Sequence, residues 1–88
     1  MNITTTTKRT RELSSLHDFR GESIVVGDRV LPIGWGDGIP LWLSNATGTV
    51  VALGRSRLHV HFDGVRYDVG DRPHSAPATH FRRVGSAQ

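Results

Sequence analysis

The sequence contains no cysteine, only one lysine and no long apolar run. Without cysteine, neither a disulfide nor a thiolate-bound zinc ion can stabilise a small core. No apolar run approaches the ~18 residues that a membrane-spanning helix requires, and the first 15 residues lack the apolar segment of a secretory signal peptide. We therefore expect a cytoplasmic protein that does not associate with a membrane.

The 88 residues are enough for one domain, and the hydrophobic pattern is confined to residues 24–84. Residues 1–23 are interpreted as a flexible basic tail. Apolar residues at three-residue spacing within it are compatible with one short amphipathic helix. Residues 85–88 are expected to fray. Because a core of this size contributes only a few kcal/mol of net stability, the sequence also leaves a homodimer open.

Ten arginines and one lysine stand against eight acidic residues, which gives a formal net charge of +3. An excess of this size permits a polyanionic partner without requiring one. Lys8, Arg9 and Arg11 lie in the tail, where they are either solvated or form an arm that contacts a phosphate backbone. As a hypothesis, the preference for arginine over lysine points to a high-GC bacterium or to a phage of such a host.

The clearest secondary-structure pattern lies in residues 48–64, which indicate two strands joined by a short turn at Gly54. Apolar and polar residues alternate in the second strand, the apolar set being Leu58, Val60 and Phe62 and the polar set Arg57, His59 and His61. Alternation at period two is typical of a half-buried strand, because successive side chains point to opposite faces. The first set is therefore predicted to lie in the core and the second on the surface.

The other predicted strands are shorter and flank this hairpin. We expect them at residues 29–33, 67–69 and 81–84. Residues 70–80 contain two prolines and are predicted to form a loop, with a 3₁₀-like turn at residues 78–81.

Residues 35–47 contain both tryptophans of the chain in a segment rich in glycine. A loop of this length is uncommon unless it is functional or disordered, and tryptophan is a favoured anchor at protein interfaces. Trp35, Asp37, Ile39 and Trp42 are therefore the candidate partner-binding residues. The structural alternative is that Trp42 packs in the core and Trp35 caps the mouth of a barrel.

Four short motifs, at residues 27–30 (GDRV), 48–51 (GTVV), 60–64 (VHFDG) and 81–84 (FRRV), together resemble the pattern of SH3-like small β-barrels. Within that group the chain is most similar to the KOW-type and Tudor-like modules of ribosomal and transcription factors. The resemblance implies an all-β, SH3-like barrel of five strands. It also implies binding of RNA or protein partners, commonly through the loops.

The polar face of the second hairpin strand is the candidate nucleic-acid surface. A turn at residues 63–64 is expected to bring Arg66 beside His61 or His59 on the neighbouring strand. Basic side chains can follow phosphates while aromatic rings stack on bases. The candidate nucleic-acid-binding residues are Arg55, Arg57, His59, His61, Arg66 and Tyr67. The alternative is a solvated face of the sheet.

Catalysis, metal binding and cofactor binding are not expected. His59 and His61 lie two residues apart on a predicted strand and could share a metal with His74 or His80, but a polar strand face explains the same spacing. No serine lies in a nucleophile elbow, and no glycine-rich phosphate loop opens a helix. The sequence thus predicts a non-catalytic binding module for a host or cognate protein, with RNA or DNA binding as the alternative.

Overall fold

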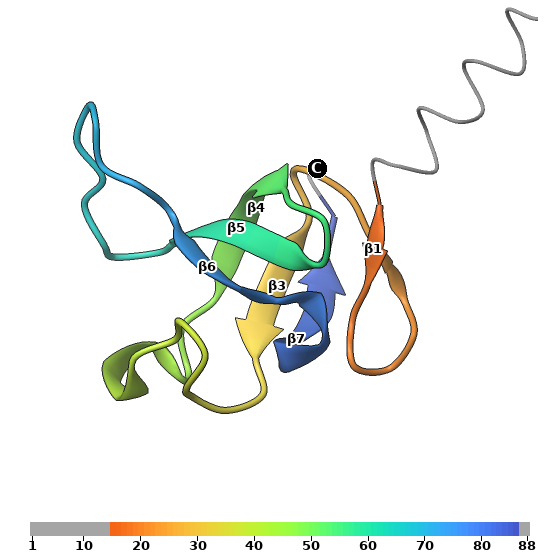
Figure 1. Cartoon of the computed structure of the whole chain (residues 1–88). Helices are drawn as coiled ribbons and strands as arrows, with labels where there is room; N and C mark the ends of the chain where they lie inside the picture. Colours follow the sequence, from red (N-terminus) through yellow and green to blue (C-terminus); the bar gives the residue numbers. More distant parts are fainter. Residues whose placement is uncertain (1–14, 87–88) are drawn as a thin grey trace, which may run out of the picture.

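The computed structural model describes residues 15–86, and within them the regular secondary structure consists of β-strands and two short 3₁₀ turns, joined by loops (Figure 1). The strands are β1 (Leu16–His17), β2 (Ser23–Ile24), β3 (Arg29–Pro32), β4 (Gly48–Leu53), β5 (Arg57–Phe62), β6 (His74–Pro77) and β7 (Phe81–Gly85). Two 3₁₀ turns, η1 (Leu41–Leu43) and η2 (Ala78–His80), precede β4 and β7. The predicted basic arm, Lys8 to Arg11, lies outside the described residues.

Five strands form one antiparallel sheet in the order β6-β5-β4-β3-β7, and β1 and β2 form a separate hairpin. The prediction of an all-β fold is confirmed and the main sheet has five strands, but the prediction that they close into a barrel is wrong. The sheet is not closed into a barrel, because over residues 15–86 the outer strands β6 and β7 do not pair with each other.

The hairpin of β4 and β5 is confirmed and carries the centre of the core. Its register pairs Gly48 with Phe62 and Val50 with Val60. A side chain at Gly48 would overlap Val60, so the close approach of the two strands requires glycine there. The predicted apolar set of β5 is buried, as the period-two pattern requires.

The core combines residues from the sheet, from the β1–β2 hairpin and from the long loop after β3. Its buried hydrophobic members are Ile24, Val30, Ile39, Leu43, Val50, Leu58, Val60, Phe62, Ala76, Ala78 and Phe81. The rings of Phe62 and Phe81 stack with their centroids 6.5 Å apart and join β5 to β7. Two of the eleven residues, Ile39 and Leu43, anchor the loop that carries both tryptophans.

The segment between β5 and β6 differs from the prediction. Residues 67–69 are not a strand; residues 63–73 instead form a loop that extends away from the sheet (Figure 1). The strand lies later, at β6, within the segment that its prolines had suggested was a loop. Because β6 is an edge strand, a proline at its end costs no ladder hydrogen bond to a further neighbour. The predicted 3₁₀ turn and the last strand are confirmed as η2 and β7.

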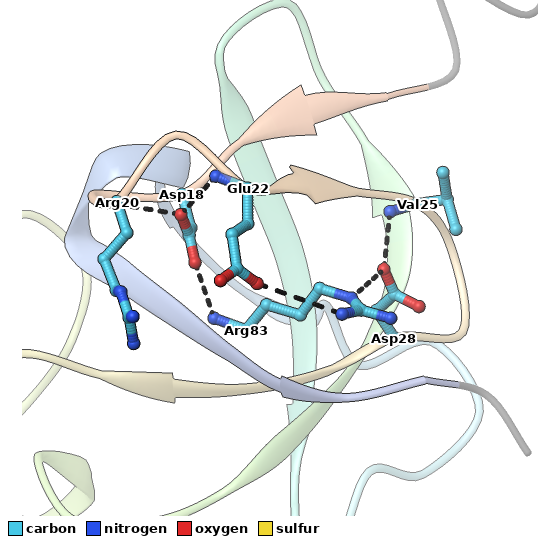
Figure 2. Close-up of polar contacts among 6 residues, drawn as sticks. All are labelled: Asp18, Arg20, Glu22, Val25, Asp28 and Arg83. Atoms are coloured by element: carbon cyan, nitrogen blue, oxygen red, sulfur yellow. Dashed lines mark hydrogen bonds and ion pairs between the residues drawn. The ribbon is translucent and has the colours of Figure 1, made fainter.

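The described part of the N-terminal extension is a hairpin rather than a helix, and Asp18 explains why (Figure 2). One oxygen of its buried carboxylate accepts hydrogen bonds from the backbone N–H groups of Arg20 (2.9 Å) and Glu22 (2.8 Å). The other oxygen accepts from the N–H of Arg83 in β7 at 2.8 Å. Burial opposes ionisation of this carboxyl, but the three backbone hydrogen bonds outweigh it and lower the pKa of Asp18.

A second buried carboxylate, that of Asp28, strengthens the same junction. It accepts hydrogen bonds from the N–H of Val25 at 3.0 Å and from Nε of Arg83 at 3.1 Å (Figure 2). Arg83 therefore contacts the hairpin through its backbone and the β2–β3 turn through its side chain. The two contacts tie residues 16–28 to the last strand.

Candidate functional site

The tryptophan loop, defined as residues 33–47 between β3 and β4, presents four large apolar side chains to solvent, of which Ile33 is the least exposed at 50%. Trp35 and Leu41 are each 65% exposed, and Trp42 is 69% exposed. Trp42 is thus on the surface rather than in the core. Ile39, a predicted partner contact, is only 3% exposed and anchors the loop instead.

A tight turn brings together the two backbone segments that carry these exposed side chains. The backbone groups of Gly36 and Ile39 bond each other in both directions, at 2.7 Å and 3.1 Å. Because an antiparallel bridge aligns the residues that flank it, Trp35 lies beside Pro40, and Leu41 and Trp42 follow directly. The turn needs residues with positive φ, and Asp37 adopts φ 51° between two glycines.

The tip of the tryptophan loop packs against the sheet at β6. A side chain at Gly38 would overlap the carbonyl oxygen of Ser75, so the two backbones are in direct contact. The guanidinium of Arg57 donates to the carbonyl oxygens of Asp37 and Ser75, both at 2.9 Å, and to Ser75 Oγ at 3.0 Å. Asp37 also lies 3.7 Å from Nε2 of His80. The structure thereby brings together Arg57 and Asp37, which the sequence had assigned to different surfaces.

Four rings form a row along one side of the domain, called here the aromatic row: His61, Tyr67, His74 and Trp42. The rings of His61 and Tyr67 stack at 4.1 Å with an interplanar angle of 17°. The Tyr67 hydroxyl accepts the N–H of Phe62 at 3.1 Å and forms a second hydrogen bond with Nδ1 of His74 at 2.8 Å. The ring of His74 in turn meets Trp42 edge-on at 6.4 Å. His74 is the member that sequence reasoning missed, because the neighbouring prolines had placed it in a loop.

The residues of the candidate nucleic-acid surface do not form one continuous basic stripe on the sheet. Arg66 does not lie on a strand; its side chain is 87% exposed and pairs with Asp68 in the loop at 2.8 Å. Tyr67, rather than Arg66, therefore covers His61. Arg55 is exposed in the β4–β5 turn, and the half-buried ring of His59 packs against that turn at Gly54.

The charge of the described domain is nearly balanced. Residues 15–86 contain eight arginines and seven acidic residues, so most of the excess charge of the chain belongs to the tail. Three of these arginines are paired with carboxylates, Arg29 with Asp63, Arg66 with Asp68 and Arg83 with Asp28. The hydrogen bond from Arg29, opposed by desolvation, lowers the pKa of Asp63. The domain therefore presents only a modest positive surface.

The described residues, 15–86, contain no pocket and no cluster of three side chains that could hold a metal ion. Within the same range, no helix is long and apolar enough to cross a membrane. Comparison of the chain with protein-family models, curated proteins and solved structures found no match. The candidate site is accordingly defined by its own geometry: an exposed apolar surface on the tryptophan loop, continued by the aromatic row.

Proposed function

We propose that this chain is a small non-catalytic binding module whose tryptophan loop anchors a protein partner. The observation that carries the proposal is the exposure of Trp35, Leu41 and Trp42 on a loop that buried residues hold in place. Several large apolar side chains exposed on one loop of a small domain are typical of interaction sites.

The exposed area is large enough to matter energetically. A tryptophan can bury up to about 250 Å², so two-thirds exposure leaves roughly 160 Å² of each ring system to cover. At about 25 cal/mol per Å², each tryptophan offers up to about 4 kcal/mol on contact with an apolar partner. Each tryptophan thus reaches the range of an interface hot spot, which begins at about 2 kcal/mol.

The finer fold assignment is part of the same proposal. We infer that the domain belongs to the SH3-like group and resembles KOW-type and Tudor-like modules. The strand order β6-β5-β4-β3-β7, the long loop after β3 and the 3₁₀ turn before β7 support this inference. In such modules the loops commonly carry the binding surface, which agrees with the position of the tryptophans.

Affinity capture from the native host tests the function. The full chain is compared with Trp42→Ala and with the control Val69→Ala, which removes a fully exposed apolar side chain from the β5–β6 loop. We expect partners that withstand nuclease treatment to be retained by the full chain and the control and lost with Trp42→Ala. Capture of the same proteins by all three baits contradicts the proposal.

Nucleic-acid binding is the second candidate, and the stacked pair of His61 and Tyr67 favours it. Such a pair, with Arg55 and Arg66 nearby in the chain, offers an aromatic platform and positive charge. Binding of mixed-sequence RNA or DNA should then weaken steeply with salt, since contacts with phosphates release counterions. Undetectable binding at low salt would eliminate this candidate and leave the protein partner.

A further inference from the structure

We propose that Arg57 is a positioning residue that fixes the tryptophan loop on the edge of β6, so that the partner surface is formed before binding. The fixed geometry is a property of the chain alone. Its use in recognition rests on the function proposed above.

The contacts of Arg57 converge on one junction. From its place on β5, the side chain donates two hydrogen bonds to Ser75 in the neighbouring strand and one to Asp37 in the loop tip. The Nη2 atom bonds both carbonyl oxygens at once, which joins the backbone of the loop to the backbone of β6. A planar guanidinium with several donors suits this geometry, whereas an ammonium or an amide does not reproduce it.

The loop tip needs such an external contact. Gly36, Asp37 and Gly38 all have positive φ, and glycine in particular has many alternative conformations in a free loop. The mutual hydrogen bonds of Gly36 and Ile39 close only a two-residue turn. Because Ile39 is buried just beyond the tip, holding Asp37 and Gly38 in place also fixes the backbone at Trp35, which leads into the turn.

The same contacts change the interpretation of Arg57 as a phosphate contact. Its donors already bond three neutral acceptors within the chain. A two-point phosphate contact through Nε and Nη2 would have to break bonds that hold the loop tip, and only Nη1 keeps N–H groups that bond nothing else within the described residues. Arg57 therefore belongs to the architecture of the tryptophan surface rather than to a nucleic-acid stripe.

Amide hydrogen exchange on the purified full chain tests this inference without any partner. Arg57→Gln is compared with the unchanged chain and with Arg55→Gln, which removes an exposed arginine two residues earlier. We expect the amides of Gly36 and Ile39 to exchange at least about tenfold faster in Arg57→Gln only, a factor that corresponds to about 1.4 kcal/mol. The amides within the β4–β5 pairing should be unchanged.

A second variant keeps the test decisive if Arg57→Gln weakens the whole fold. Ser75→Ala removes only the Oγ acceptor and should raise exchange at the same two amides by about threefold, since the hydrogen bonds from Arg57 to the two carbonyl oxygens remain. Unchanged exchange at Gly36 and Ile39 in Ser75→Ala, together with unchanged or merely global effects in Arg57→Gln, overturns the proposal. If amide exchange responds as expected but Trp42→Ala captures the same proteins as the full chain, the positioning role of Arg57 is supported and the proposed function fails.

Discussion

Replacement of Asp18 by alanine should destabilise the domain more than any exposed carboxylate replacement, although Asp18 lies outside the five-stranded sheet. Asp18 is 3% exposed, and its carboxylate accepts three backbone hydrogen bonds, one of them from Arg83 in β7. A hydrogen bond to a charged group contributes about 1.5–3 kcal/mol to stability. Arg20 and Glu22 are exposed, so water can replace the lost acceptor at their N–H groups, but not fully at Arg83.

We therefore expect Asp18→Ala to lower the free energy of unfolding by about 2–3 kcal/mol. Stability of about 0.05–0.15 kcal/mol per residue gives the described domain roughly 4–11 kcal/mol in total, so this loss is a large fraction. With a urea m-value of about 1.5 kcal/mol/M, the unfolding midpoint should fall by about 1–2 M. Asp18→Asn keeps one acceptor oxygen, so its unfolding midpoint should lie between those of the unchanged chain and Asp18→Ala.

Urea denaturation followed by circular dichroism measures this difference. Asp68→Ala is the matched control, because Asp68 pairs with Arg66 in an ion pair whose members are both exposed. Such pairs contribute about 0–1 kcal/mol. If the midpoints of Asp18→Ala and Asp68→Ala shift equally, the β1–β2 hairpin is not held by this carboxylate and the reasoning is refuted.

Three further outcomes are expected. The folded-state pKa values of Asp18 and Asp63 lie below their ordinary value. The stability that these two carboxylates contribute is therefore fully present above about pH 5 and is lost as the pH falls below about 4. Urea unfolding midpoints from pH 6 to pH 2.5 measure this loss, and a midpoint that stays constant over that range would contradict the prediction. Gly48→Ala should cost about 1–3 kcal/mol in thermal unfolding, because the added methyl overlaps the facing strand, whereas Gly34→Ala, at an open position, should stay within about 0.5 kcal/mol. Tyr67→Phe removes the hydroxyl that bonds both β5 and β6 and should cost about 1–2 kcal/mol in urea denaturation; an unchanged midpoint would show that the hydroxyl does not hold the loop.

The local sequence pattern predicted a secondary-structure element correctly where that element is stabilised by residues close to one another in the chain. The β4–β5 hairpin follows from alternation along β5 and from a glycine turn, and both features act within about 15 residues. The prolines around β6 misled the prediction, because proline excludes a central strand but not an edge strand, and the position of a strand in its sheet is not a local property. The apolar spacing near residue 16 favoured a helix, but the hydrogen bonds of the buried Asp18 carboxylate, one of them to Arg83 in β7, stabilise a hairpin there instead.

The candidate site shows the same division. Composition alone identified the tryptophan segment, since two tryptophans in a glycine-rich loop are unusual at any position. Composition could not show that Ile39 points into the core while Trp42 points out, because burial depends on what the loop packs against. Nor could it show that Arg57 belongs with Asp37, which is 20 residues away in the chain.

The sequence by itself determined the β class of this protein, its central hairpin and the segment where an apolar surface emerges. These features depend on period-two alternation, turn residues and composition, all of which act over short stretches of chain. Only the tertiary structure decided that the sheet stays open, that Asp18 bonds Arg83 across 65 residues, and that the loop tip rests on β6. Each of those depends on contacts between segments that become neighbours only when the chain has folded.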